Sequence, residues 1–138
     1  MKLKSLSIAA LLGAGLLASA QAQTEIQWWH SMTAFNNEWV NTLAKEFNAS
    51  QKTYKVTPIY KGSYDESMTA AIAAFRAGNA PHILQVFEVG TATMMASKGA
   101  IVPAGKVMAD AGYKFDPNAY VAAVAGYYTA PNGQMLSF

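Results

Sequence analysis

The sequence contains no cysteine, few prolines and little charge. Without cysteine the chain has no disulfide bond, no thiolate metal site and no cysteine nucleophile. Only 13% of the residues are charged, and no basic run or arginine cluster indicates nucleic-acid binding. The stability of the fold must therefore come from a hydrophobic core, for which the 52% of hydrophobic residues provide the material.

The first 22 residues have the pattern of a secretory signal peptide. Lys2 and Lys4 give a positive start, Leu6 to Leu17 form an apolar segment, and Ala20-Gln21-Ala22 is a small-x-small cleavage site. The apolar segment is too short to span a bilayer comfortably. We therefore expect an exported chain that begins near Gln23 after cleavage and is not an integral membrane protein. Without the two leader lysines the 10 basic residues fall to 8, which equals the 8 acidic residues.

Strand and helix patterns alternate after the leader. β-Favouring residues from Thr24 to Trp29 and from Tyr54 to Tyr60 predict two strands. Between them, apolar residues recur at three-and-four spacing from about 33 to 48, which predicts an amphipathic helix. A second helix is predicted to begin after Ser63, because Ser63 and Glu66 fit a capping box, and to end before Gly78.

The segment Ala80 to Gly90 is predicted to contain a strand buried on both faces, because a run of about six residues rich in Ile, Leu, Val and Phe lies between Pro81 and Gly90. A short helix from Thr91 to Lys98 is expected next. Further on we expect a brief helix between 104 and 112 and a helix from Asp116-Pro117 to about Val124. Residues 127–129 and 134–138 are expected to form two strands around an Asn-Gly turn.

This alternation predicts an α/β fold with a mostly parallel sheet flanked by helices. No cap or polar tail follows the last predicted strand, so residues 23–138 are expected to be part of a larger domain.

Polar side chains follow each of the three main predicted strands: His30-Ser31, Gly62-Ser63-Tyr64 and Glu88. Because the carboxyl ends of parallel strands meet at one edge of a sheet, these side chains should lie near one another. A tyrosine, a serine and a glutamate offer an apolar ring, hydroxyl groups and a strong acceptor. Such a set is typical of a site for a small polyol or sugar-like ligand, with or without phosphate.

Each candidate also has a structural interpretation. His30 could be an interior histidine with its hydrogen bonds satisfied, and no second histidine nearby or suitably spaced carboxylate supports a metal site. Neighbours in a strand point to opposite sides, so His30 and Ser31 would not form a catalytic pair, and one of Trp28 and Trp29 should face the core. Motifs of nucleotide-binding loops, serine hydrolases and zinc proteases are absent. Binding is therefore favoured over catalysis, and we expect no enzyme activity.

Four segments together resemble one known family. They are Trp29-His30-Ser31-Met32, Tyr60-Lys61-Gly62-Ser63-Tyr64, residues 70–81 (AAIAAFRAGNAP) and residues 85–97 (QVFEVGTATMMAS). Over essentially the whole exported segment the sequence is similar to the glycerol-phosphate receptors of the extracellular solute-binding family, which serve ABC importers. In that family the ligand lies between two α/β lobes that close on it, and the receptor then docks on the membrane permease.

The resemblance implies a periplasmic binding protein-like amino-terminal lobe with its second lobe missing. It implies a periplasmic monomer that binds sn-glycerol 3-phosphate, without a cofactor, and delivers it to ABC permease subunits with their ATPase. Tyr64 and Glu88 match family residues that contact the ligand, and Ser63, Trp29 and His30 are candidates beside them.

Glu88 should accept hydrogen bonds from the glycerol hydroxyls, because a carboxylate beside a phosphate would repel it. The resemblance gives the phosphate no cationic partner within this chain, since the family's second lobe and its arginine are missing. We therefore expect this polypeptide by itself to bind the ligand very weakly.

Other functions remain open on the sequence alone. The receptor could take glycerophosphodiesters as well, or an unphosphorylated sugar or polyol instead. A secreted hydrolase that uses Glu88 or His30 is a third interpretation, and a nonfunctional truncated fragment, prone to aggregation through exposed apolar surface, is a fourth.

Overall fold

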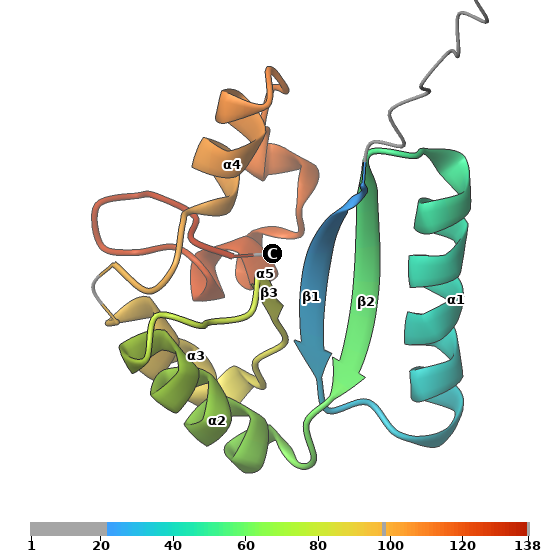
Figure 1. Ribbon diagram of the computed structural model, residues 1–138. Coiled ribbons are helices and arrows are strands. Elements are labelled where there is room, and N and C mark those ends of the chain that lie inside the picture. Colours follow the sequence, from blue (N-terminus) through green and yellow to red (C-terminus); the bar gives the residue numbers. More distant parts are fainter. Residues whose placement is uncertain (1–21, 98, 138) are drawn as a thin grey trace, which may run out of the picture.

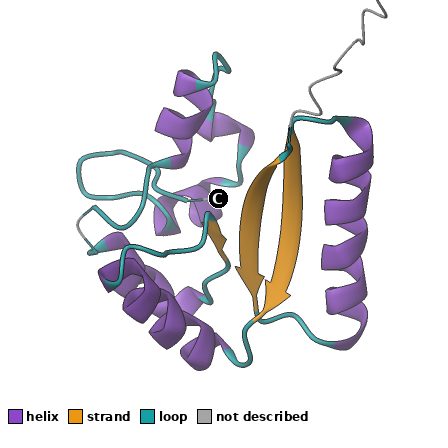
Figure 2. Cartoon of the chain, in the orientation of Figure 1, coloured by secondary structure: helices purple, strands orange, loops and turns teal. Residues whose placement is uncertain are grey.

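The computed structural model describes residues 22–97 and 99–137, so the expected signal peptide lies almost entirely outside the described residues. The elements in chain order are shown in Figure 1 and, coloured by type, in Figure 2. They are β1 (Thr24–His30), α1 (Ala34–Ser50), β2 (Tyr54–Tyr60), α2 (Tyr64–Arg76), β3 (Ile83–Leu84), α3 (Glu88–Met95), α4 (Ala104–Asp110), the 3₁₀ helix η1 (Pro117–Ala119) and α5 (Ala122–Tyr127).

The three strands form a parallel sheet in the order β2-β1-β3. Strand β1 is central and pairs with β2 over its full length, from Thr24 opposite Tyr54 to His30 opposite Tyr60. Helix α1 lies beside β2, whereas α2 and α3 lie on the other side of the sheet (Figure 1). The predicted α/β fold with a parallel sheet flanked by helices is confirmed.

Helix α1 is fixed to the free edge of β2 by one side chain. Asn48 donates from Nδ2 to the Val56 carbonyl at 2.8 Å and accepts the Val56 amide at Oδ1 at 2.7 Å. These bonds satisfy backbone groups that an edge strand otherwise leaves unpaired. Val40 and Ala44 are the buried residues of the helix. In the described part of the chain, no helix is long and apolar enough to cross a membrane.

The predicted capping box at the start of α2 is confirmed. The Glu66 amide donates to Ser63 Oγ at 3.3 Å, and the Ser63 amide donates to Glu66 Oε2 at 2.7 Å. The hydrogen bond from the Ser63 backbone, and then that from its side chain, lower the pKa of Glu66 because they stabilise the charged carboxylate. Gly62 precedes the box with φ +81, and the Glu66 carboxylate occupies the space that a Cβ at this position would need.

The prediction of a doubly buried strand between Ala80 and Gly90 is wrong. Only Ile83–Leu84 form a strand, and Ile83 is 45% exposed, because β3 pairs with β1 alone and no described strand covers its other edge. Helix α3 begins at Glu88 and not at Thr91. Gly90, expected to precede the helix, is buried within its first turn, where a Cβ would lie 3.1 Å from Met68 Sδ of α2. This glycine permits close packing of the two helices.

The carboxyl-terminal segment also differs from the prediction. The helix expected from Asp116 to Val124 is divided: Asp116 caps the short η1, and α5 follows separately. Tyr127, expected in a strand, ends α5 and donates its hydroxyl to the Glu88 carbonyl. Within the described part of the expected hairpin, an isolated antiparallel bridge joins Thr129 and Met135, and backbone hydrogen bonds from Ala130 to Gln134 and from Leu136 to Tyr128 flank it.

The described chain leaves much apolar surface exposed. Four residues at four-residue spacing form a stripe along α1 that the described chain covers only in part: Phe35 (78% exposed), Trp39 (54%), Leu43 (37%) and Phe47 (44%). Contiguous apolar surface of this kind usually indicates an interface. The stripe agrees with the expectation of a partial domain.

Replacing Gly62 with alanine is expected to destabilise the fold more than replacing Gly112. Both glycines have positive φ, 81 and 80, so alanine carries the same backbone strain of about 1 kcal/mol at either position. At Gly62 the new Cβ would also lie 2.3 Å from Glu66 Oε2, whereas at Gly112 nothing lies within 4 Å. Loss of the capping bonds should add about 1 kcal/mol. Urea unfolding of both variants measures the difference, and equal losses would contradict this account of the capping box.

Candidate functional site

The segments that follow the three strands meet at the carboxyl edge of the sheet, as predicted. The Lys61 amide donates to the His30 carbonyl at 2.9 Å, and the Gln85 amide donates to the Trp29 carbonyl at 2.9 Å. Both bonds continue the parallel pairing beyond the last strand residues. The Gln85 side chain completes the junction, because its Oε1 accepts the Ser31 amide at 3.0 Å.

An aromatic stack joins the starts of α2 and α3 at this edge. The rings of Tyr64, the first residue of α2, and Phe87, the N-cap of α3, are stacked with centroids 5.3 Å apart and an interplanar angle of 27°. Glu88 follows Phe87 directly and is exposed. Within the described residues no hydrogen bond or ion pair occupies its carboxylate, and a negative charge in a first helical turn is favoured by the helix dipole. Tyr64 and Glu88 are therefore brought to the same part of the surface.

Ser63 lies between Lys61 and Tyr64 and has a structural role already. Its Oγ accepts the Glu66 amide, and its hydroxyl, after its backbone amide, helps to lower the pKa of the Glu66 carboxyl, so the side chain is engaged within the capping box. Contact between Ser63 and a ligand stays a prediction.

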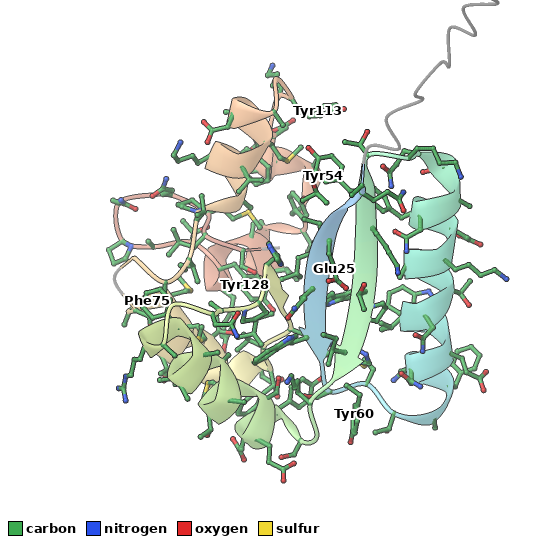
Figure 3. The ribbon with its side chains drawn as sticks, viewed as in Figure 1. Glu25, Tyr54, Tyr60, Phe75, Tyr113 and Tyr128 are labelled. Carbon is green, nitrogen blue, oxygen red and sulfur yellow. The ribbon has the colours of Figure 1, made fainter. Side chains whose placement is uncertain are left out.

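His30 lies beneath the surface layer. It is 1% exposed, and its ring lies 6.2 Å from that of Trp28 and 6.1 Å from that of Tyr60. Figure 3 shows Tyr60 at the carboxyl end of β2 and Tyr54 at the amino end of the same strand. Burial lowers the pKa of His30, because the charged imidazolium loses its hydration. Its Nδ1 has no hydrogen-bond partner among the described residues, nor have Ser31 Oγ and Ser67 Oγ. The interpretation of His30 as an interior histidine is thus correct about its burial. Its Nδ1, however, is not satisfied by a hydrogen bond within the described residues.

Trp29 is also in the core, with 8% exposure, while Trp28 is half-buried. The Trp29 indole donates from Nε1 to Gln27 Oε1 at 3.2 Å, and Lys61 Nζ lies 3.8 Å from the ring centroid. The ring is therefore covered by a cation, and a ligand at this edge would meet Lys61 before Trp29. Direct ligand contact by Trp29 or His30 stays a prediction.

Three residues of this edge were not among the predicted site residues: Lys61, Gln85 and Phe87. Gln85 had a sequence signal, since it is a single amide within an apolar run. Lys61 and Phe87 had none, because their positions depend on contacts with Trp29 and Tyr64 from other elements.

The edge has the chemistry of a binding site for a small polar molecule. It combines a free carboxylate, a stacked tyrosine, a serine hydroxyl and one ammonium group. In residues 22–97 and 99–137 no group of three or more His, Asp or Glu side chains could hold a metal ion. The buried His30 has no carboxylate partner there that could orient it as a general base.

An α/β sheet with polar groups gathered at the carboxyl edge is typical of ligand-binding lobes, and the chain is indeed similar to periplasmic binding proteins. It is 49% identical over 136 residues to the sn-glycerol-3-phosphate-binding periplasmic protein UgpB of Rhizobium meliloti, with 99% of this chain and 32% of that protein covered. It is 53% identical over 136 residues to the protein of the same name from Brucella suis, covering 96% of this chain and 31% of that protein.

The same name belongs to a relative from Escherichia coli, which is 53% identical over 127 residues, 91% of this chain and 29% of that protein. The chain thus spans about a third of the length of the curated relatives it matches. No family model matches the chain. The similarity confirms the resemblance found in the sequence.

Lowering the pH is expected to destabilise the fold through His30. Its folded-state pKa lies below the ordinary value of 6.5, so the unfolded chain binds the proton more readily and stability falls as the pH drops below 6.5. Urea unfolding at about pH 7.5 and about pH 5.5 measures this loss. It should shrink in His30→Phe, which keeps an aromatic ring between Trp28 and Tyr60.

His82→Asn is the matched control for this experiment. His82 is the second of the 2 histidines, and its Nδ1 accepts the Gln27 amide at 3.1 Å, a bond that asparagine can replace. The loss of stability at low pH should persist in His82→Asn. The same pH dependence in His30→Phe as in the parent chain would contradict the assignment to His30.

Proposed function

We propose that residues 23–138 form part of the amino-terminal lobe of a periplasmic solute receptor, exported through a cleaved signal peptide. The receptor binds sn-glycerol 3-phosphate as a monomer and delivers it to ABC permease subunits with their ATPase, without catalysis. The names of the relatives support the ligand and the compartment. The observation that carries the proposal is the Tyr64–Phe87 stack, which sets a free carboxylate, Glu88, beside a tyrosine at the carboxyl edge of the sheet.

Each group at the edge has a part in this proposal. The Glu88 carboxylate accepts hydrogen bonds from the glycerol hydroxyls, and charge-assisted bonds of this kind are stronger than neutral ones. The Tyr64 ring, held by Phe87, packs on the carbon backbone of the ligand and directs its hydroxyl toward it. Ser63 adds a hydroxyl group at the same turn. Trp29 and His30 support the edge from below.

A receptor for an unphosphorylated sugar or polyol is the second candidate, and one observation favours it. Three carboxylates, those of Asp65, Glu66 and Glu88, occupy the first turns of α2 and α3, against the single cation of Lys61. Negative charge in this excess repels a phosphate dianion unless further cations face the site. Affinities for sn-glycerol 3-phosphate and for glycerol distinguish the two candidates.

A chimera tests the proposal directly. In the Escherichia coli relative, the matching segment is replaced with the corresponding residues of this chain, and binding is measured by titration calorimetry. The chimera is expected to bind sn-glycerol 3-phosphate and not glycerol. Glu88→Gln and Tyr64→Ala should each weaken binding by about tenfold or more, the usual effect of losing one charge-assisted or stacking contact.

Two control variants separate site effects from general effects. Glu38→Gln removes an exposed carboxylate on α1, and Tyr113→Ala removes an aromatic ring that is 69% exposed. Both should bind the ligand as the parent chimera does. A chimera that binds glycerol and sn-glycerol 3-phosphate equally well, or neither of them, would refute the proposed function.

A further inference from the structure

We propose that Lys61 supplies the cation that holds the phosphate group within this lobe. The inference rests on the proposed function, and it names the ligand contact that the matched residues Tyr64 and Glu88 do not provide. It is carried by the position of the Lys61 ammonium, which is fixed against Trp29 and has no acidic partner in the described residues.

Lys61 is held through both its backbone and its side chain. Its backbone amide is bonded to the His30 carbonyl at 2.9 Å, which places the residue at the carboxyl edge of the sheet. Its Nζ lies 3.8 Å from the centroid of the Trp29 ring, and Trp29 is itself held by its bond to Gln27. A cation over an indole face is attracted to the ring and loses much of its freedom. The ammonium is therefore oriented before any ligand arrives.

The N–H donors of the Lys61 ammonium are available to a ligand. An aromatic ring attracts a cation without accepting hydrogen bonds as strongly as a carboxylate does, so N–H groups that point away from the ring stay available. Among the described residues the one ion pair joins Lys106 to Asp110 at 2.7 Å, on α4. The other lysines of the described chain are exposed, whereas Lys61 is half-buried. Lys61 is thus the lysine best placed to form a strong contact with an anion.

The surrounding charges determine which end of the ligand lies beside Lys61. Glu66 is engaged by the Ser63 amide, and Glu88 and Asp65 are exposed at the first turns of α3 and α2. A phosphate is repelled by these carboxylates and attracted by Lys61, so it lies toward β2 and away from the first turns of α2 and α3. The glycerol hydroxyls then lie toward α3 and Glu88. One ligand orientation satisfies both charges.

The test uses the chimera described above and two substitutions of Lys61. Lys61→Met removes the charge but keeps an apolar stem against Trp29, and Lys61→Gln keeps a polar end group. Both are expected to weaken binding of sn-glycerol 3-phosphate by about tenfold or more, as loss of a charged contact does. Inorganic phosphate should compete with the ligand in the parent chimera and should compete much less in these variants. Lys61→Arg, which keeps the charge and the contact with the ring, should restore most of the affinity.

Lys55→Met is the matched control, because Lys55 lies on β2, the strand that Lys61 follows, and is exposed. It should leave both the affinity and the competition by phosphate unchanged. If Lys61→Met and Lys61→Gln bind sn-glycerol 3-phosphate as the parent does, the inference about Lys61 is overturned while the proposed function stands. A parent chimera that does not bind the ligand overturns the proposed function, and this inference with it.

Discussion

Two backbone hydrogen bonds determine where the functional groups of this chain lie. The bonds from Lys61 to the His30 carbonyl and from Gln85 to the Trp29 carbonyl extend the pairing of the central strand after β2 and β3 have ended. They place both following segments against the end of β1 and lead directly into α2 and α3. The stacked rings of Tyr64 and Phe87 depend on this arrangement, because each ring stands at the start of one of these helices.

The same edge contains groups that stability alone does not favour. His30 Nδ1, Ser31 Oγ and Ser67 Oγ are buried without a hydrogen-bond partner among the described residues, and each such group costs free energy. The Lys61 ammonium faces an aromatic ring although three carboxylates belong to the adjacent helix turns. Local departures from optimal pairing tend to gather at functional sites. Two of these three unpaired groups belong to neighbouring residues, His30 and Ser31, at the end of β1.

The sequence predicted those features whose causes are local. Strands β1 and β2 and helix α1 follow from residue preference and apolar spacing, and the Ser63–Glu66 capping box needs only residues three apart. The sequence failed where tertiary contacts decide. An apolar run near Ile83 suggested a long buried strand, but a strand at the edge of the described sheet pairs on one side only. The sequence pattern predicts that Gly90 ends a strand, whereas in the structure its missing side chain allows α3 to pack on Met68.

In the candidate site, too, the sequence predicts the features with local causes and misses those that depend on tertiary contacts. The predicted location of the site at the carboxyl edge follows from the parallel order of the strands, and Glu88, Ser63 and Tyr64 are predicted there because polar residues after strands are conspicuous in a sequence. Lys61 is not among the predicted site residues, because a lysine after a strand is ordinarily a solvated surface residue. Its significance depends on the Trp29 ring beneath it, which the structure alone reveals.

The central claim is that the carboxyl edge of this sheet is one face of a glycerol phosphate site. Backbone amide chemical shifts of the isotope-labelled chain from Gln23 onward, followed during titration with sn-glycerol 3-phosphate, test it most directly because they detect even very weak binding. The account predicts shifts concentrated at the ends of β1 and β2 and at the first turns of α2 and α3, with much smaller shifts for glycerol. Shifts confined to other regions, such as the exposed stripe of α1, or no shifts at any ligand concentration, would contradict it.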